Sequence, residues 1–223
     1  MHNSKFIETQ AIHSGRINDE QFGSLATPLY QTSTFIFDNA EQGAERFAGE
    51  SEGFIYTRLG NPTTRQLEMR VAAMEGMEDA AATATGMAAV SGALLANLSA
   101  GDHIISSKAV YGCTFALISH MLTKFGIEVS FVDMSTPENI TAEIKENTKV
   151  LFLESPVNPN LEVLDLAAIL SITKKHNIIS VVDNTFMTPV LQQPAKMGAD
   201  IIIHSATKYL NGHGDVVAGI IGG

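Results

Sequence analysis

A lysine closely follows a run of three isoleucines, residues 201–203, near the end of the sequence. Such a run is typical of a buried strand, and Ser205, Thr207 and Lys208 come soon after it. A lysine amine can form an imine with an aldehyde, and neighbouring hydroxyls can donate hydrogen bonds to a phosphate. These residue types predict a covalent site for an aldehyde that carries a phosphate. For Lys208 taken alone, a solvated surface lysine remains the alternative.

A carboxylate follows a second apolar run in the same way. Residues 178–182 are Ile-Ile-Ser-Val-Val, and Asp183 comes next. A carboxylate at the end of a buried strand is desolvated and needs a partner. A protonated pyridine nitrogen is one possibility, and a helix N-cap is the other. With Lys208 and the hydroxyls, Asp183 completes the groups that bind pyridoxal 5'-phosphate (PLP): an imine lysine, a partner for the pyridine nitrogen and donors to the phosphate.

Two further turns follow apolar runs and offer groups that this cofactor uses. Gly86 and Met87 come after residues 80–85 and open a helical segment, so their N–H groups can form an anion site. Tyr111 follows the run that begins at residue 103, and its ring can stack on a pyridine while its phenol transfers protons. An ordinary β–α turn is the alternative for Gly86.

Three more residues are candidates on weaker grounds. Cys113 lies two residues after Tyr111 and is either reactive toward a sulfur substrate or a small buried apolar residue. Asn158 lies in a loop between two prolines and could bind a ring substituent, or the loop is a plain X-Pro connection. Arg58 can form paired hydrogen bonds with a phosphate, or it lies on the surface.

Composition restricts the class of protein. The 223 residues include 24 Asp and Glu against 14 Lys and Arg, a net charge of −10, which disfavours nucleic acid and anionic membranes as partners. Cys113 is the single cysteine and no apolar leader is visible at residues 1–5, so we expect a reducing, cytoplasmic location. Residues 80–101 lack charge, but Gly86 and many small polar residues favour a strand, a turn and a buried helix over a membrane span. No metal ion is expected.

The apolar pattern predicts an α/β fold in which helices flank a mostly parallel sheet. Residues 1–60 lack clear periodicity and are expected to form an irregular N-terminal arm that packs on something else, and residues 61–223 are expected to form one large domain. Asn61 and Pro62 predict the start of a helix that ends near Gly76. Strands are expected at 80–85, 103–106, 128–132, 150–153, 178–182, 201–204 and 216–221. Helices are expected at 87–98, 111–125, 139–147, 164–176 and 190–197.

Several motifs, in this order, resemble those of the Cys/Met-metabolism PLP enzymes. The resemblance runs from Thr9 to the last residue and covers the segments 56–63, 86–87, 154–159, 183–185 and 200–214. It implies the aspartate-aminotransferase-like architecture known as PLP fold type I. It also implies a homotetramer built from tight dimers, and a smaller C-terminal domain that is absent from this chain and supplies the arginine for the substrate carboxylate.

The resemblance also implies roles for individual residues. Lys208 binds PLP, Asp183 pairs with the pyridine nitrogen, Tyr111 stacks on the ring and Asn158 contacts the ring hydroxyl. Thr185 belongs to the cofactor-binding set. The phosphate is held by a larger group, in which the last two members reach a neighbouring subunit: Gly86, Met87, Ser205, Thr207, Tyr56 and Arg58.

Within the family, the segment Tyr111-Gly112-Cys113-Thr114 resembles methionine γ-lyases, and so do residues 58–63 and 122–127. The activity implied is α,γ-elimination of a sulfur amino acid, with Lys208, Tyr111 and Cys113 as catalytic residues and L-methionine as the leading substrate. Cystathionine γ-lyase, cystathionine γ-synthase and O-acetylhomoserine sulfhydrylase are the alternatives within transsulfuration and related amino-acid metabolism. A non-catalytic, truncated paralogue that joins full-length subunits is the alternative of another class.

Overall fold

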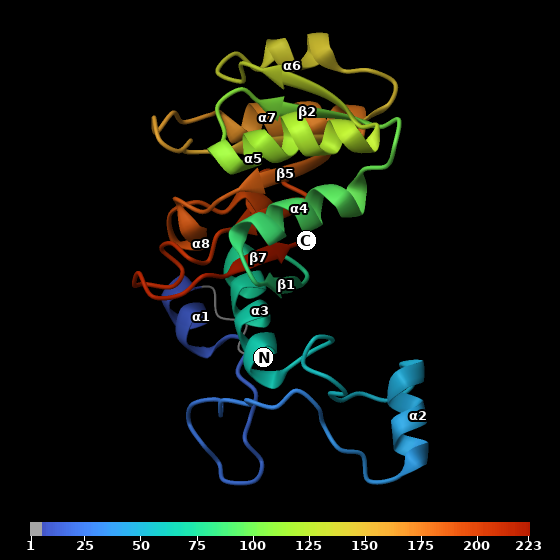
Figure 1. Ribbon diagram of the computed structural model, residues 1–223. Helices are drawn as coiled ribbons and strands as arrows, with labels where there is room; N and C mark the ends of the chain where they lie inside the picture. The colour runs from blue at the N-terminus through green and yellow to red at the C-terminus, as the bar shows by residue number, and fades with distance from the viewer. Residues whose placement is uncertain (1–5) are drawn as a thin grey trace.

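A seven-stranded sheet forms the centre of the protein, for which a computed structural model describes residues 6–223 (Figure 1). The strand order is β1-β7-β6-β5-β4-β2-β3. Strands β6, β5, β4, β2 and β3 run parallel, whereas β7 pairs antiparallel with both β1 and β6. This arrangement confirms the predicted mostly parallel sheet. The strands are β1 Ala80–Thr83, β2 His103–Ser107, β3 Glu128–Val132, β4 Thr148–Glu154, β5 Ile179–Asp183, β6 Ile201–His204 and β7 Gly219–Gly222.

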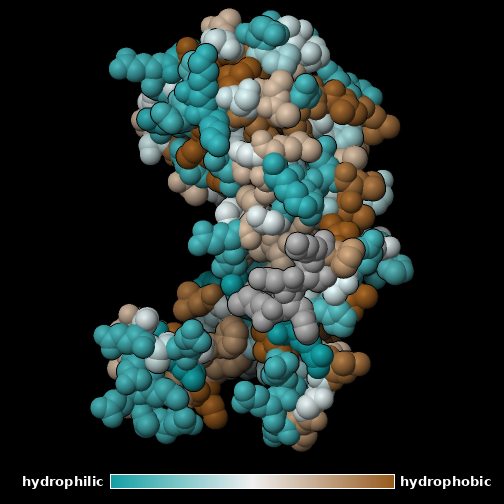
Figure 2. All heavy atoms as spheres, turned by 180° about the vertical axis from the view of Figure 1, so that it is seen from behind, coloured by the Kyte–Doolittle hydropathy of each residue, from teal (hydrophilic) through white to brown (hydrophobic). Residues whose placement is uncertain are grey.

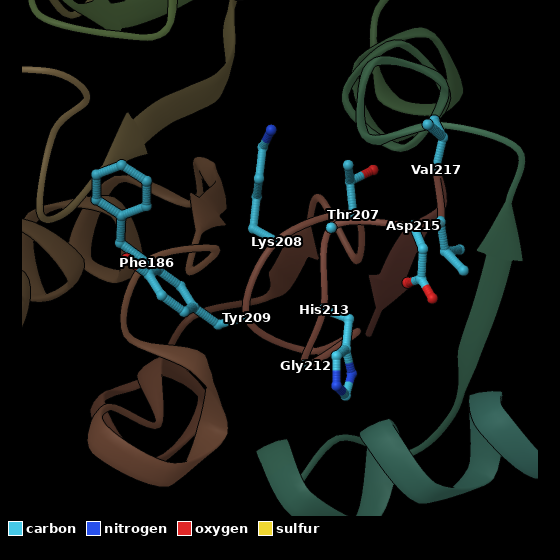
Figure 3. A pocket seen from close by; sticks show the side chains of 10 residues that line it. Phe186, Thr207, Lys208, Tyr209, Gly212, His213, Asp215 and Val217 are labelled. Carbon is cyan, nitrogen blue, oxygen red and sulfur yellow. The ribbon is translucent and has the colours of Figure 1, made fainter.

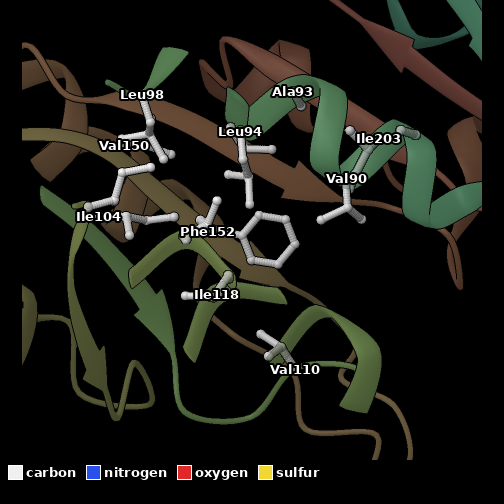
Figure 4. Close-up of a cluster of buried hydrophobic side chains, with 14 residues drawn as sticks. Val90, Ala93, Leu94, Leu98, Ile104, Val110, Ile118, Val150, Phe152 and Ile203 are labelled. Atoms are coloured by element: carbon white, nitrogen blue, oxygen red, sulfur yellow. The ribbon is translucent and has the colours of Figure 1, made fainter. Parts of the chain in front are cut away.

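Helices cover both faces of this sheet, which explains the continuous apolar runs. Successive residues of β4 point to opposite faces: Phe152 belongs to the cluster around α4, and Leu151 and Leu153 belong to the cluster around α7. Figure 4 shows the first cluster, with the Phe152 ring facing Leu94 and Val90 of α4. The helices of this part are α3 Pro62–Glu75, α4 Gly86–Asn97, α5 Gly112–Ala116, α6 Glu138–Glu143, α7 Leu166–His176 and α8 Thr188–Leu191.

Helix α3 begins and ends where the sequence predicts. The side chain of Asn61 accepts a hydrogen bond from the Thr63 N–H, Pro62 occupies the first turn, and Gly76 adopts the left-handed conformation at the C-cap. Near that end, Oε1 of Glu75 accepts a hydrogen bond from Nδ2 of Asn184 (2.8 Å) and lies 2.6 Å from Nε2 of His204. These buried contacts fix α3 against the ends of β5 and β6.

Two predicted helices are wrong as single elements. The segment 111–125 contains α5, a π-helical turn at Leu117–Met121 and a 3-10 turn at Leu122–Phe125. The hydroxyls of Ser119 and Thr123 donate to carbonyls four residues earlier, an arrangement that distorts helices. The segment 190–197 is interrupted because Pro194 has no N–H and restricts the residue before it. Helix α8 therefore ends at Leu191, and a separate 3-10 turn covers Pro194–Met197.

The N-terminal arm has more structure than the sequence predicts. It contains α1 Ile7–His13 and α2 Ala40–Ala48. Helix α1 is fastened to α3 because Arg70 donates hydrogen bonds to the carbonyls of Ser14 (3.0 Å) and Ile12 (3.2 Å). The remainder of the arm leads away from the sheet to α2 (Figure 1). Seen from behind, the surface is indented between the body that contains the sheet and the lobe that contains α2 (Figure 2). The first five residues of the predicted arm lie outside the described residues.

The uncharged segment 80–101 contains β1, a turn and the whole of α4. Across residues 6–223, no helix combines the length and the apolar character needed to cross a membrane.

Candidate functional site

A cavity of about 260 Å³ lies where the carboxyl ends of β4, β5 and β6 meet the start of α4. This is the edge of a parallel sheet at which ligands usually bind. Most of the predicted site residues line it: Gly86, Met87, Tyr111, Asn158, Asp183, Thr185, Ser205, Thr207 and Lys208.

Asp183 ends β5 with one carboxylate oxygen satisfied and the other free. The N–H of Thr185 (3.0 Å) and its hydroxyl (2.5 Å) both donate to Oδ1, and these are the only hydrogen bonds that the described residues provide to this carboxylate. Burial raises the pKa of Asp183, while the hydrogen bonds from Thr185 lower it. A cationic donor in the cavity would therefore find a desolvated acceptor at Oδ2.

Thr185 also joins the ends of β5 and β6. Its hydroxyl donates to Asp183 and accepts a hydrogen bond from the Ser205 N–H at 2.8 Å. The sequence motif 183–185 thus fixes the loop that follows β6. The alternative role of Asp183 as a helix N-cap is wrong, because its bonds serve this turn and the next helix, α8, begins only at Thr188.

The start of α4 offers free N–H groups to an anion. Oγ1 and the carbonyl of Thr85 accept hydrogen bonds from Ala88 (2.9 Å) and Ala89 (3.1 Å), so the N–H groups of Gly86 and Met87 lack intrahelical acceptors. Gly86 approaches β6 so closely that a Cβ at this position would lie 2.6 Å from Cβ of Ser205. Glycine is therefore required for the helix start and the Ser205 loop to meet around one small anion.

The two hydroxyls beside Lys208 differ in their partners. Thr207 Oγ1 donates to the Ala218 carbonyl at 3.2 Å and accepts from the Ala218 N–H at 3.1 Å, which ties the loop to the start of β7. The hydroxyl of Ser205 has no hydrogen-bond partner among the described residues and faces the cavity. Ser205 is therefore the more available donor for an anion.

The side chain of Lys208 projects freely between two adjoining cavities. The second, of about 710 Å³, is lined by the loop from Tyr209 to Val217, and the residues it shares with the first are Phe186, Thr207, Lys208 and Val217. Figure 3 shows the amine extended between Phe186 and Thr207. None of the hydrogen bonds or ion pairs found among residues 6–223 involves Nζ of Lys208. Lys208 is exposed in this chain, so the dry environment expected for a reactive lysine is not formed by residues 6–223 alone.

Tyr111 and Cys113 form a pair at the rim of the cavity. A hydrogen bond joins Sγ of Cys113 to the phenol oxygen of Tyr111 at 3.4 Å. This hydrogen bond, together with the charge of a thiolate at the same place, raises the pKa of Tyr111. The phenol therefore keeps its proton near neutral pH. Cys113 is exposed, which excludes its alternative role as a buried apolar residue.

Tyr56 and Arg58 do not reach this cavity. They lie on the arm, where the Arg58 guanidinium stacks over the Tyr56 ring at 5.0 Å from its centroid. Arg58 lines a separate hollow beside α3, formed with residues such as Phe54 and Glu68. The described chain thus does not bring these two residues together with Lys208.

Sequence reasoning missed several residues of the cavity wall: Thr85, Val90, Thr114, Glu154, Phe186 and Val217. Glu154 stands out because it ends β4 and is only 5% exposed. Burial, followed by repulsion from Asp183, raises the pKa of Glu154 to about 7. A charged residue directly after an apolar run was the signal that identified Asp183, and the same signal applies to Glu154.

The cavity has the donor set that PLP requires. The free carboxylate oxygen of the partly buried Asp183 suits a protonated pyridine nitrogen, the N–H groups of Gly86 and Met87 suit a phosphate, and Lys208 supplies an amine for the aldehyde. Among residues 6–223, no group of three His, Cys, Asp or Glu side chains is placed to hold a metal ion.

Comparison with known proteins supports this interpretation. Over 216 residues the chain is 55% identical to L-methionine gamma-lyase of Fusobacterium nucleatum subsp. polymorphum, and over 215 residues it is 46% identical to cystathionine beta-lyase of Lactococcus lactis subsp. cremoris. Each match covers 96% of this chain and 54% of the relative. The chain therefore spans about half the length of the curated relatives it matches.

A solved structure of a candidate O-acetylhomoserine (thiol)-lyase from Campylobacter jejuni superimposes with a TM-score of 0.93 at 41% identity. The match covers 98% of this chain and 54% of that one, which contains an N'-pyridoxyl-lysine-5'-monophosphate. The family model described as Cys/Met metabolism PLP-dependent enzyme matches residues 8–223. The fold, the donor set of the cavity and these matches agree: the chain belongs to the Cys/Met metabolism PLP-dependent enzyme family, whose cofactor is pyridoxal 5'-phosphate.

Proposed function

We propose that this chain forms the cofactor-binding part of a lyase that carries out α,γ-elimination of L-methionine. The observation that carries the proposal is the single cavity in which Lys208, Asp183 and the start of α4 meet, in a chain that is 55% identical to an L-methionine gamma-lyase. With one water consumed, methionine would yield methanethiol, ammonia and 2-oxobutanoate.

Each polar group of the cavity has a role in this proposal. PLP, when bound, supplies an aldehyde and a ring that accepts negative charge from the substrate's α carbon. Lys208 anchors the aldehyde and moves the α proton, and Asp183 holds the proton on the ring nitrogen. Asn158 contacts the ring hydroxyl, and Thr185 orients Asp183. The phosphate is held by Gly86, Met87, Ser205 and Thr207.

Tyr111 and Cys113 are proposed to act on the departing sulfur. A thiolate leaving group needs a proton, and the phenol of Tyr111, whose pKa is raised by the contact with Cys113, carries one near neutral pH. The Tyr111 ring also lines the cavity and can stack on the pyridine. Cys113 then positions the phenol that donates the proton.

The substrate class remains part of the proposal because relatives with other activities are nearly as similar. The cystathionine beta-lyase at 46% identity and the O-acetylhomoserine candidate at 41% represent two alternatives. Thiol release from L-methionine, from cystathionine and in replacement of a homoserine ester distinguishes them in one set of assays. Release from cystathionine alone would overturn the choice of methionine.

We further propose that the protein works as a tetramer of tight dimers in the cytoplasm. The arm carries large apolar side chains that are almost fully exposed, including Phe22 (80%), Leu25 (82%) and Ile36 (93%). Such a surface is typical of an interface, and Tyr56 and Arg58 on the same arm would then reach the phosphate of a neighbouring copy. The single, exposed cysteine suits a reducing compartment.

The decisive experiment is reductive trapping of the cofactor. Incubation of the purified chain with PLP, borohydride reduction and peptide mapping should place the label on Lys208, and Lys208→Ala should lose both the label and the visible absorbance. Lys174→Ala on α7 is the control and should retain both. Label on another lysine, or absorbance retained by Lys208→Ala, would refute the assignment.

The non-catalytic alternative has its own test. A truncated assembly module would co-elute with a full-length family member in size exclusion without taking up cofactor in its own cavity. Cofactor bound to Lys208 of this chain in such a complex would reject that alternative.

A further inference from the structure

One carboxylate in the cavity is left without a role by the proposed chemistry. Glu154 is the last residue of β4, it is 5% exposed, and it contributes to the cavity wall next to Asp183. A buried carboxylate is costly unless its oxygens are hydrogen-bonded. Its partners therefore indicate what it holds in place.

Both oxygens of Glu154 bind backbone groups of proposed cofactor-binding residues. Oε2 accepts the N–H of Tyr111 at 2.8 Å, and Oε1 accepts the N–H of Asn158 at 3.1 Å. Tyr111 precedes α5 after strand β2, and Asn158 lies in the loop after β4. One side chain thus connects two loops that belong to different strands.

Few other contacts hold the backbone of Tyr111 in the position that Glu154 gives it. Tyr111 is the N-cap of α5, where no side chain caps the helix, and the residue is 43% exposed. The side-chain amide of Asn158 has no hydrogen-bond partner among the described residues, so it is available to a ligand. The placement of both side chains depends on the backbone positions that Glu154 fixes.

Glu154 also lies beside Asp183. The two residues are directly paired in the register of β4 and β5, so their side chains leave the sheet on the same face. Two neighbouring buried carboxylates repel each other when both are ionised, and a cation bound to Asp183 would relieve that repulsion. Occupation of the cavity and the charge on Glu154 are therefore coupled.

We propose that Glu154 is a positioning residue that holds the Tyr111 and Asn158 loops on either side of the cofactor ring. The inference rests on the proposed function. Glu154→Gln retains the shape but offers one acceptor for two N–H groups, whereas Glu154→Ala removes both. Each variant should weaken PLP binding about tenfold, which corresponds to one lost hydrogen bond to a charged group. Each should also reduce the circular dichroism of bound PLP at equal occupancy.

A measurement on the cofactor-free chain separates this inference from the proposed function. The protein has four tyrosines, so labelling with ¹⁵N-tyrosine gives a small set of amide resonances, and Tyr111→Phe identifies the one from Tyr111. Glu154→Gln should shift that resonance and leave those of Tyr30, Tyr56 and Tyr209 unchanged. Glu162→Gln, the same change in the loop that follows β4, is the matched control and should shift none of them.

The outcomes are distinct. A Tyr111 resonance that does not move in Glu154→Gln, or wild-type affinity and dichroism in that variant, would overturn the positioning role. If Glu154→Ala fails to fold, the positioning role is decided by Glu154→Gln and its Tyr111 amide shift, which are measured independently. If the wild-type chain fails to take up PLP, the proposed function fails while the amide shift still tests the contact.

Discussion

Two neighbouring carboxylates, Asp183 and Glu154, contribute to the response of the cofactor-free protein to pH. The pKa of each is raised, chiefly by burial, and that of Glu154 reaches about 7. Because the folded state then binds protons more tightly than the unfolded chain, the stabilising contribution of each group is fully present below its unfolded pKa. For Glu154 that contribution is lost as the pH rises from about 4.5 through about 7.

We therefore expect the free energy of unfolding to fall across that interval, by on the order of 2 kcal/mol. Urea titrations of the cofactor-free chain at pH 5 and pH 8 measure the difference. Asp183→Asn removes one of the two charges and should flatten the profile, whereas Asp165→Asn, on the far side of the sheet at the start of α7, should not. A wild-type profile that rises with pH would contradict the assignment of both pKa values.

The phenol of Tyr111 supports a prediction about catalysis. Under the proposed function, Tyr111→Phe keeps a ring that can stack on the cofactor and removes the proton offered to the departing thiol. In the active protein, methanethiol release should slow by about a hundredfold, within the range for a lost general acid, while the PLP absorbance is unchanged. Tyr30→Phe on the arm is the control. Equal rates for Tyr111→Phe and wild type would reject Tyr111 as the acid.

At the scale of elements, the junction between α4 and the Ser205 loop depends on a glycine. Gly86→Ala would place a Cβ 2.6 Å from Cβ and 2.9 Å from Cα of Ser205, so a backbone segment has to move. We expect PLP affinity to fall at least tenfold and stability to fall by about 1–3 kcal/mol. Binding measured by absorbance and unfolding measured by urea check the two parts.

Gly92→Ala in the same helix is the matched control. Its added Cβ meets only the terminal Cδ1 of Ile221 at 3.2 Å, which a rotation can relieve. Alanine is also the better helix former by about 1 kcal/mol. Binding should therefore be retained, and equal losses in both variants would show that the contact with Ser205 is not the cause.

The elements also show which parts of the site the sequence could predict. Lys208 and Asp183 were found because each follows an apolar strand, and parallel strands bring their carboxyl ends to one edge. The role of Glu154 could not be found in this way, because it depends on the N–H of Tyr111, 43 positions away. The helices expected at 111–125 and 190–197 failed for local reasons, since hydroxyl-to-carbonyl bonds and Pro194 override apolar spacing.

At the scale of the whole molecule, contacts within one chain do not account for the exposed apolar surface and the position of the arm. It leads away from the sheet (Figure 1), exposes apolar side chains such as Ile36, and carries Tyr56 and Arg58 outside the cavity of their own chain. If these two residues complete the phosphate site of a neighbouring copy, every site is shared between two chains. A shared site can be tested by complementation.

Arg58→Ala and Lys208→Ala should each abolish reductive labelling at Lys208 when expressed alone. Co-expressed in equal amounts, they should form mixed dimers in which the intact Arg58 of one chain faces the intact Lys208 of the other. Random pairing makes about half of the dimers mixed, each with one complete site, so about a quarter of all sites should regain label. The double variant Arg58→Ala/Lys208→Ala, co-expressed with either single variant, restores no site. If the mixed dimers form and remain unlabelled, Arg58 does not serve the neighbouring chain.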